Sequence, residues 1–480
     1  MSLAFSRAAG ECFVNFAELR FWQYLGFGLA LILLVRVPLA RLRPALLGDY
    51  DRCALACLGL GLLAAVSWLS LGIFICVLLT AYLGVAWTLR RPASAHRGAA
   101  LLLGVLVLLP LLYFKYADFF GNQVLGLGWS ALGTVAIPVG ISFYSFQKVA
   151  FVADTLAFRR PLPKFLDFVN FAAFFPQIVA GPIERRADLM PQVEAFRFGW
   201  SPADLDRGAG YVALGMFFKL ALADNLAAFV DPAPADNGYL IWAANFFFGL
   251  RIYYDFAGYS LIAVGLAQML GIRLTLNFRS PYCAGSVVEF WRRWHVTLSQ
   301  WFRDYVYQPL GGGGVRWWWA NVLLVFVVSG IWHGAGWNFA LWGALHGGYL
   351  IVNRLCRNRL RRLPAVGHVL TLLAVAFAWL PFYEARTAVL WLKLRALVRP
   401  EAYAGGRLTE AARHWTPGDR LTMGTFAALA VVMLVAEGFS LRAGGEPYSR
   451  LLRRPVLLAL VVITVFVAPG VNNGFVYFAF

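Results

Sequence analysis

Long apolar stretches and short basic segments alternate along the whole chain. Many of the apolar stretches approach the length of about 20 residues that a membrane-spanning helix needs. A transmembrane β-barrel would instead show short segments in which apolar and polar residues alternate. The pattern therefore predicts an all-α polytopic membrane protein, built as one bundle of about 11 to 12 transmembrane helices.

The basic segments predict the topology, because lysine and arginine collect in the cytoplasmic loops of membrane proteins. The first apolar run, Phe21–Val37, is followed by Arg41 and Arg43 and not by a small-residue cleavage site. We therefore expect a retained span with its N-terminus outside, and not a signal peptide. Later arginine clusters, after residues 88 and 156, fall on the same side of the expected membrane.

Two apolar stretches have basic residues at both ends, so each is expected to enter the membrane and return. Phe165–Pro182 is the shorter one, and Ala320–Val352 is the longer. The first arm of the longer stretch reaches His333 after about 14 residues, or roughly 21 Å of helix, whereas a full crossing needs roughly 30 Å. Gly334 and Gly336 offer a turning point there. We expect His333 to lie deep, among re-entrant elements around a central pore.

The longest expected cytoplasmic stretch is Arg273–Trp318, and its middle repeats large apolar residues at helical spacing. The repeating positions are Phe290, Trp294, Leu298, Trp301 and Tyr305. This spacing predicts one interfacial amphipathic helix, ended by the glycine run Gly311–Gly314. A second amphipathic helix is expected near Ala388–Leu397, in an outer loop.

Charge and motif content narrow the possible functions. Lysine and arginine number 42 against 24 acidic residues, a net charge of +18. The excess fits the positive-inside rule, or a cytoplasmic face that attracts anionic lipid or a phosphate-bearing donor. Without a basic soluble domain, nucleic-acid binding is not expected. The chain has no Walker loop, GxSxG, HExxH or zinc-ligand spacing, so ATP-driven transport, serine hydrolysis and a metal site lose support.

Ionisable residues inside a membrane are costly, and they point to function by default. His333 is the strongest candidate, because a neutral imidazole can act as a general base. His346 lies in a stretch where Gly343 and Gly347 form a small-xxx-small packing pair, so we expect it to support packing. Asp255 follows Arg251 by four residues, which suggests an ion pair within one helix. The tryptophans are expected mostly in the interfacial belts.

Several long motifs, in one order, resemble the membrane-bound O-acyltransferase family and its alginate O-acetyltransferase branch. The motifs are "YFKYADFF" at Tyr113, "IPVGISFYSFQKVAFVADTL" at Ile137, "FFPQIVAGPIERRADLMPQ" at Phe174, "YYDFAGYSLIAVGLA" at Tyr253, "FWRRWHVTLSQWFRDYVYQPLGG" at Phe290, "GIWHGAGWNFALWGALHG" at Gly330 and the tail "GFVYFAF". Ala257 and Leu261 depart from the usual "DFSGYSDMAIG" pattern. The resemblance implies one membrane-embedded acyltransferase domain over residues 1–480. Within it, 1–110 match poorly, 111–350 hold the core motifs, and 351–480 form the last spans.

The resemblance also implies a reaction and its residues. An acetyl group would pass from cytoplasmic acetyl-CoA, a donor substrate and not a bound cofactor, to an extracytoplasmic polysaccharide. An SGNH-type acetyltransferase would assist in the periplasm, outside a bacterial inner membrane. The family's invariant histidine falls on His333 and its second histidine on His295. Trp332, Asn338, His346 and Asp255 are expected to support the site, and Arg292, Arg293 and Arg303 to hold the CoA phosphates.

Other functions remain open at this stage. A transporter or flippase for an acyl donor or lipid would also need a cavity and broken helices. A scaffold for an outer transferase would not need the histidines. Acetylation of peptidoglycan or cellulose, or D-alanyl transfer, would use the same fold.

Overall fold

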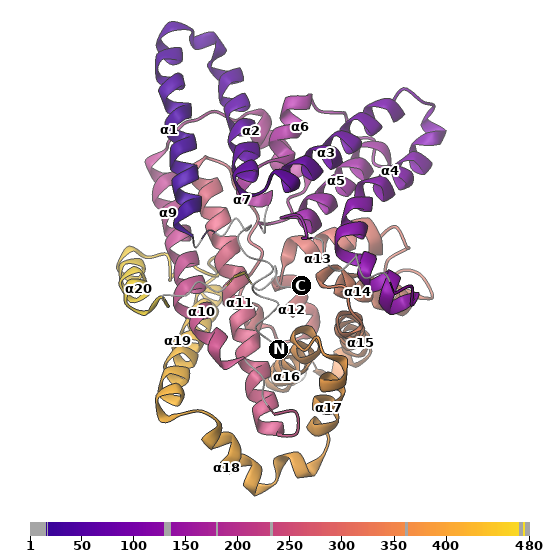
Figure 1. Cartoon of the computed structure of the whole chain (residues 1–480), viewed down its shortest axis with the longest axis vertical. Helices are drawn as coiled ribbons and strands as arrows, with labels where there is room; N and C mark the ends of the chain where they lie inside the picture. Colours follow the sequence, from indigo (N-terminus) through magenta and orange to yellow (C-terminus); the bar gives the residue numbers. More distant parts are fainter. Residues whose placement is uncertain are drawn as a thin grey trace. The chain divides into compact units, whose positions relative to one another are not determined.

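The computed structural model describes residues 16, 18–128, 136–178, 181–230, 234–360, 363–469 and 474–475 (Figure 1). This part of the chain is helical and contains no β-strand, which confirms the predicted all-α class. The chain divides into two units, Met1–Ala209 with Ile262–Thr275, and Gly210–Leu261 with Leu276–Phe480. Most of the tail "GFVYFAF" lies outside the described residues.

The first unit is built mainly from helices of the N-terminal half. Its helices are α1 (Leu19–Leu42), α2 (Leu47–Val66), α3 (Trp68–Thr88), α4 (His96–Leu111), α5 (Ile141–Leu156), α6 (Phe165–Ala172), α7 (Phe175–Ile178) and α8 (Arg186–Glu194). Helices α3, α4 and α5 pack against one another, and α1 packs against α2 (Figure 1). The expected re-entrant stretch is two short helices, α6 and α7, and at eight residues α6 rises only about 12 Å.

The second unit contains the histidine-bearing motifs. Its helices are α10 (Asp224–Leu226), α12 (Val287–Arg293), α13 (Val296–Phe302), α14 (Trp318–His333), α15 (Trp337–Leu360), α16 (Pro364–Tyr383), α17 (Thr387–Leu397), α18 (Gly405–His414), α19 (Pro417–Arg442) and α20 (Arg454–Val467). Helices α9 (Pro202–Met216) and α11 (Gly238–Met269) contribute residues to both units. Helix α17 confirms the helix expected near Ala388–Leu397.

Six helices of the described chain are long and apolar enough to cross a membrane. They cover Leu19–Leu42, Trp68–Thr88, Ala93–Tyr116, Pro202–Phe229, Pro364–Tyr383 and Pro417–Arg442. Two further apolar helices, α14 and α20, are shorter. The protein is therefore a multi-pass membrane protein. The expected number of 11 to 12 spans also counted shorter apolar stretches as crossings, and it stays a prediction.

The predicted single amphipathic helix through residues 290–305 is wrong, because the chain breaks at His295. Helix α12 ends at Arg293, Trp294 is extended, and His295 has a left-handed backbone with φ 41°. Backbone bonds to a neighbouring segment replace helical bonds at the break. The Val296 amide donates to the Asn277 carbonyl at 2.9 Å, and the Arg279 amide donates to the Arg293 carbonyl at 2.9 Å. A side chain adds to this, since the Thr297 hydroxyl donates to Oδ1 of Asn277 at 2.6 Å.

The predicted turn after His333 is confirmed. Helix α14 ends at His333, and α15 starts at Trp337 and packs back along it (Figure 1). Two glycines permit this close crossing. A Cβ at Gly330 would overlap the carbonyl oxygen of Phe339, and one at Gly343 would overlap that of Phe326. The small-residue packing expected for these positions is therefore present, as contact between backbones.

Candidate functional site

His333 ends α14 in a shell of aromatic rings. Its imidazole is 4% exposed. Ring centroids lie 4.9 Å away at Trp332, 5.1 Å at Trp342 and 5.3 Å at Phe382. The three rings come from α14, α15 and α16, so three helices together fix the position of this histidine.

His295 lies beside the same shell. Its ring is fully buried, 6.1 Å from the indole of Trp332 and 4.7 Å from the ring of Phe256. The helix break allows this position, because in a continuous helix residue 295 would follow the axis of α12. His295 lies outside the candidate spans, and complete burial lowers its pKa to about 3. The imidazole is therefore neutral at physiological pH.

His346 joins the cluster through α15. Nε1 of Trp291 donates a hydrogen bond to its Nδ1 at 3.3 Å, which leaves the proton on Nε2. Trp342 lies 4.8 Å from His346 and 5.1 Å from His333, so both histidines contact one indole. On one straight helix, thirteen residues would separate them by about 20 Å. The hairpin removes that separation, because the two residues lie on opposite arms.

The prediction that the tryptophans mostly mark the membrane interface is wrong for those near the histidines. Trp294, Trp342 and Trp379 are among the largest fully buried side chains of the described protein. They form a connected wall, with Trp379 5.2 Å from Trp294 and 6.4 Å from Trp342. This role was not predicted from the sequence, although the number of tryptophans within the histidine motifs could have indicated it.

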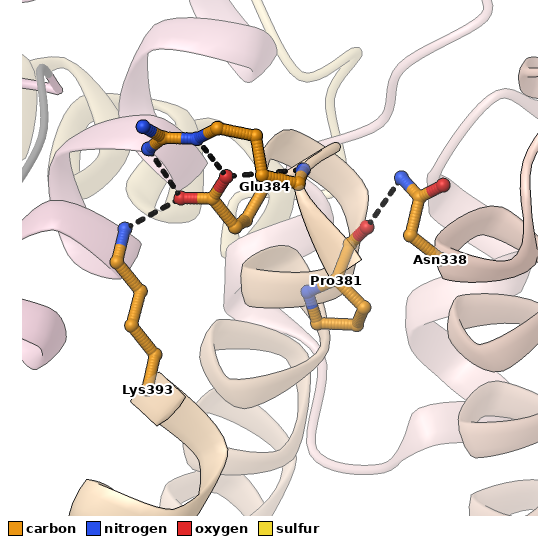
Figure 2. Close-up of polar contacts among 5 residues, drawn as sticks. Asn338, Pro381, Glu384 and Lys393 are labelled. Atoms are coloured by element: carbon orange, nitrogen blue, oxygen red, sulfur yellow. Dashed lines mark hydrogen bonds and ion pairs between the residues drawn. The ribbon is translucent and has the colours of Figure 1, made fainter. Parts of the chain in front are cut away.

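Asn338 ties the start of α15 to the end of α16. Its Nδ2 donates to the carbonyl oxygen of Pro381 at 3.0 Å, as Figure 2 shows. The last carbonyls of a helix have no partner within it. The side chain of Asn338 therefore caps a helix end beside Phe382, which itself contacts His333. Through this bond Asn338 would support the site by holding the end of α16, as the expected supporting role requires.

An ion cluster lies directly after Pro381 and consists of the buried Glu384 and Lys393 and the exposed Arg386 (Figure 2). Glu384 receives two hydrogen bonds from the Arg386 guanidinium, at 2.8 and 3.0 Å, and one from Nζ of Lys393 at 2.9 Å. Burial alone would raise the pKa of Glu384, but these two cations lower it below its usual value. The carboxylate thus stays charged and holds α17 against the end of α16.

Asp255 also has a structural role. Its carboxylate forms a 2.7 Å ion pair with Lys219, which forms a second 2.7 Å pair with Asp224. The three side chains are almost fully buried. The sequence spacing had pointed to Arg251, four residues earlier on α11, and could not reveal a partner from the distant π-helix η6 (Phe217–Ala223). Phe256, the next residue, contacts His295.

Two of the three expected phosphate-binding arginines share a pocket. Arg292 and Arg303 line a cavity of about 440 Å³ that also includes Tyr307 and Ser329. Ser329 lies one helical turn before His333 on α14. Arg293 lines a different and larger cavity, and its guanidinium pairs with Glu289 at 2.5 Å. The described residues contain no group of three side chains suited to a metal ion.

The arrangement is suited to proton transfer. Three buried histidines lie among aromatic rings, which exclude water and fix ring orientation. A neutral imidazole in such a site can accept a proton from a bound hydroxyl. A basic pocket beside the same helix can take a phosphate-bearing molecule.

Comparisons with known proteins agree with the family that the motifs resemble. A family model described as MBOAT, membrane-bound O-acyltransferase family, matches residues 105–390. A peptidoglycan O-acetyltransferase of Helicobacter pylori is 33% identical over 341 residues, covering 63% of this chain and 64% of that protein. A probable alginate O-acetylase of Pseudomonas aeruginosa is 35% identical over 374 residues, covering 73% and 68%. One of Pseudomonas putida is 31% identical over 436 residues, covering 83% and 87%. The chain thus spans somewhat less than two thirds of the Helicobacter relative.

Proposed function

The chain belongs to the membrane-bound O-acyltransferase family, and from this premise we propose that it transfers an acetyl group from acetyl-CoA toward an extracytoplasmic polysaccharide. One observation carries the proposal: His333 and His295, from different elements, lie against the same indole of Trp332. This contact supports the proposal that both histidines, which belong to separate motifs, serve one site in the second unit.

The chemistry we propose is acyl transfer with His333 as general base. A hydroxyl of the acceptor attacks the carbonyl carbon of the acetyl thioester while His333 takes the hydroxyl proton. A C–O bond forms, the C–S bond breaks, and the CoA thiolate leaves and takes up a proton. His295, neutral because of its burial, would hydrogen-bond or relay a proton.

The pocket with Arg292 and Arg303 is the proposed site for the donor. Guanidinium groups bind phosphate oxygens with charge-assisted hydrogen bonds. Arg303 is paired with Asp304 at 2.7 Å, so donor binding would compete with that contact. Ser329 lines the same pocket and lies one helical turn before His333 on α14. The thioester end of a donor bound here would therefore lie near His333.

The acceptor we propose is an exopolysaccharide of the alginate kind. The support is that relatives with this printed function match up to 83% of the chain. The peptidoglycan relative makes cell-wall polymer the second candidate. A periplasmic SGNH-type transferase would complete delivery outside a bacterial inner membrane.

The test uses purified full-length protein in sealed proteoliposomes with radiolabelled acetyl-CoA. We expect release of free CoA thiol and transfer of label to a polysaccharide acceptor, and loss of both in His333→Ala. His414→Ala is the matched control, because His414 is an exposed histidine on the outer helix α18. Uptake of intact acetyl-CoA without thiol release would identify a transporter instead. Full activity of His333→Ala would refute the assigned base.

A further inference from the structure

A second cavity of about 1120 Å³ lies in the same unit, between helices α11, α16 and α19. Its walls are mostly apolar, with Trp242 and Phe246 from α11, Leu373 from α16, and Val435 and Phe439 from α19. Several wall residues remain about half exposed, including Leu373 at 50% and Val435 at 51%. The cavity is therefore open along its side, where candidate spans α16 and α19 would face lipid.

The cavity has the length of one bilayer leaflet. From His368 to Trp379, α16 rises about 16 Å, and α19 rises about the same from Val431 to Arg442. Half of a typical hydrocarbon core is about 15 Å thick. An acyl chain that enters at the His368 end and lies along this slot would extend past the middle of α16 as far as Trp379.

Cationic and polar groups gather at one end of this apolar slot. Arg442 ends α19, Arg293 ends α12, and His368 lies near the start of α16, and all three line the cavity. Nδ1 of His368 is 3.0 Å from the carbonyl oxygen of Ala284, so it donates there and ties the start of α16 to this end of the cavity. The other end, at Trp242 and Trp379, is aromatic.

Both arginines act on the same wall residue. Burial and the Glu437 carboxylate raise the pKa of the Cys283 thiol, and Arg293 and Arg442 oppose that rise. Glu289, which pairs with Arg293, offsets part of the positive charge. Arg442 is the more exposed of the two arginines and lies at the end of its helix.

We propose that this cavity binds one anionic phospholipid, with its phosphate at Arg442 and Arg293 and an acyl chain along the apolar walls. Charge and length both favour a lipid over a soluble ligand. The mouth lies on the side predicted to be cytoplasmic, where anionic lipids are most abundant. The site is separate from the pocket of Arg292 and Arg303, and it does not depend on the acetyl-transfer proposal.

Trp379 would connect this lipid to the histidine cluster. It lines the inner end of the cavity and lies 5.4 Å from Phe382, which contacts His333. A bound acyl chain would therefore pack against Trp379 on the cavity side, opposite the histidine cluster.

The experiment is native mass spectrometry of the delipidated full-length protein, titrated with dioleoylphosphatidylglycerol or dioleoylphosphatidylcholine. We expect one tightly retained phosphatidylglycerol and weaker binding of phosphatidylcholine. Arg442→Gln should weaken phosphatidylglycerol about fivefold and leave phosphatidylcholine unchanged, since one arginine near an anionic surface is worth about that factor. Arg453→Gln, an exposed arginine at the start of α20, is the control for charge.

Ala376→Phe tests the apolar slot, because Ala376 lines it. This variant should lose the retained lipid of either kind, whereas Ala365→Phe, an exposed position on the same helix, should keep it. If Ala376→Phe fails to fold, Leu373→Trp fills the same space from the next turn. Equal binding of the two lipids, unchanged by Arg442→Gln and Ala376→Phe, would mean only annular lipid and would overturn the proposal.

Discussion

His295 and His333 have a common ring neighbour: the indole of Trp332 lies 6.1 Å from the first and 4.9 Å from the second. They come from sequence motifs 38 positions apart, and the contact depends on two separate backbone features. One is the helix break at His295, and the other is helix α14, which carries Trp332 and His333 at consecutive positions. Each feature can be tested through the residues that hold it.

Replacing Trp332 should disturb the distance between the two histidines. Trp332→Ala removes a nearly buried ring and should destabilise the protein by about 3–5 kcal/mol. If the ring positions His333, Trp332→Ala should also lower kcat at least about tenfold with less change in KM. Trp332→Phe should restore much of the activity. Equal losses in both variants would indicate that the indole itself, and not its bulk, is required.

The hydrogen bond from Asn338 to the Pro381 carbonyl should stabilise the packing of α15 against α16. Asn338→Ala leaves a buried helix-end carbonyl without this donor, at a cost of about 1–3 kcal/mol. We expect a lower thermal midpoint and a smaller loss of acetyl transfer than in His333→Ala. Thermal unfolding in nanodiscs measures the first effect. Asn321→Ala is the matched control, because Asn321 also donates to a backbone carbonyl, that of Leu310, but at the other end of α14. A stability loss in that control alone would contradict the assignment.

The buried ion triad predicts an order of effects. Lys219→Met leaves Asp224 and Asp255 buried without their shared cation, so it should destabilise the protein most, by about 3–5 kcal/mol or more. Asp255→Asn keeps the pair between Lys219 and Asp224, and should cost less. Expression level and thermal midpoint of the two variants give the comparison. The reverse order would show that Asp255 has a role beyond this triad.

Acidification should destabilise the protein through His295. Its pKa is about 3 in the folded chain and about 6.5 when exposed, so between these values the unfolded state binds the extra proton. Stability then falls as pH is lowered through 6.5, by about 2 kcal/mol at pH 5. Thermal midpoints measured from pH 7.5 to 5 should show this slope. His295→Gln should reduce this slope but not abolish it, because burial also lowers the pKa of His346 to about 3 and so adds a similar slope. His414→Gln, at an exposed site, should leave the slope unchanged.

The sequence predicted elements whose cause is local. The turn after His333 follows from glycines, the α17 helix follows from periodicity, and the membrane class follows from long apolar runs. The broken helix at His295 could not be predicted, because its cause is hydrogen bonding to Asn277 and Arg279, which precede it by a loop and a short helix. The apolar residues from Phe290 to Leu298 keep helical spacing along the sequence, although the backbone leaves the helix at Trp294 and His295.

The site residues divide in the same way. His333 and His295 were named from their motifs, but their common contact with Trp332 depends on tertiary packing. The partner of Asp255 was missed because Lys219 lies on an element 36 positions away in sequence. The role of Trp342 between two histidines was missed because tryptophan in a membrane protein more often marks the interface.

The left-handed backbone of His295 limits how this protein can evolve. At φ 41° most residues with a side chain are disfavoured; histidine tolerates this conformation better than most, but glycine or asparagine adopts it more readily. Neither supplies an imidazole. Under the proposed chemistry, selection for stability and selection for activity therefore act against each other at this one position. Directed evolution that selects only for a more stable loop should therefore replace His295 and yield well-folded but inactive proteins.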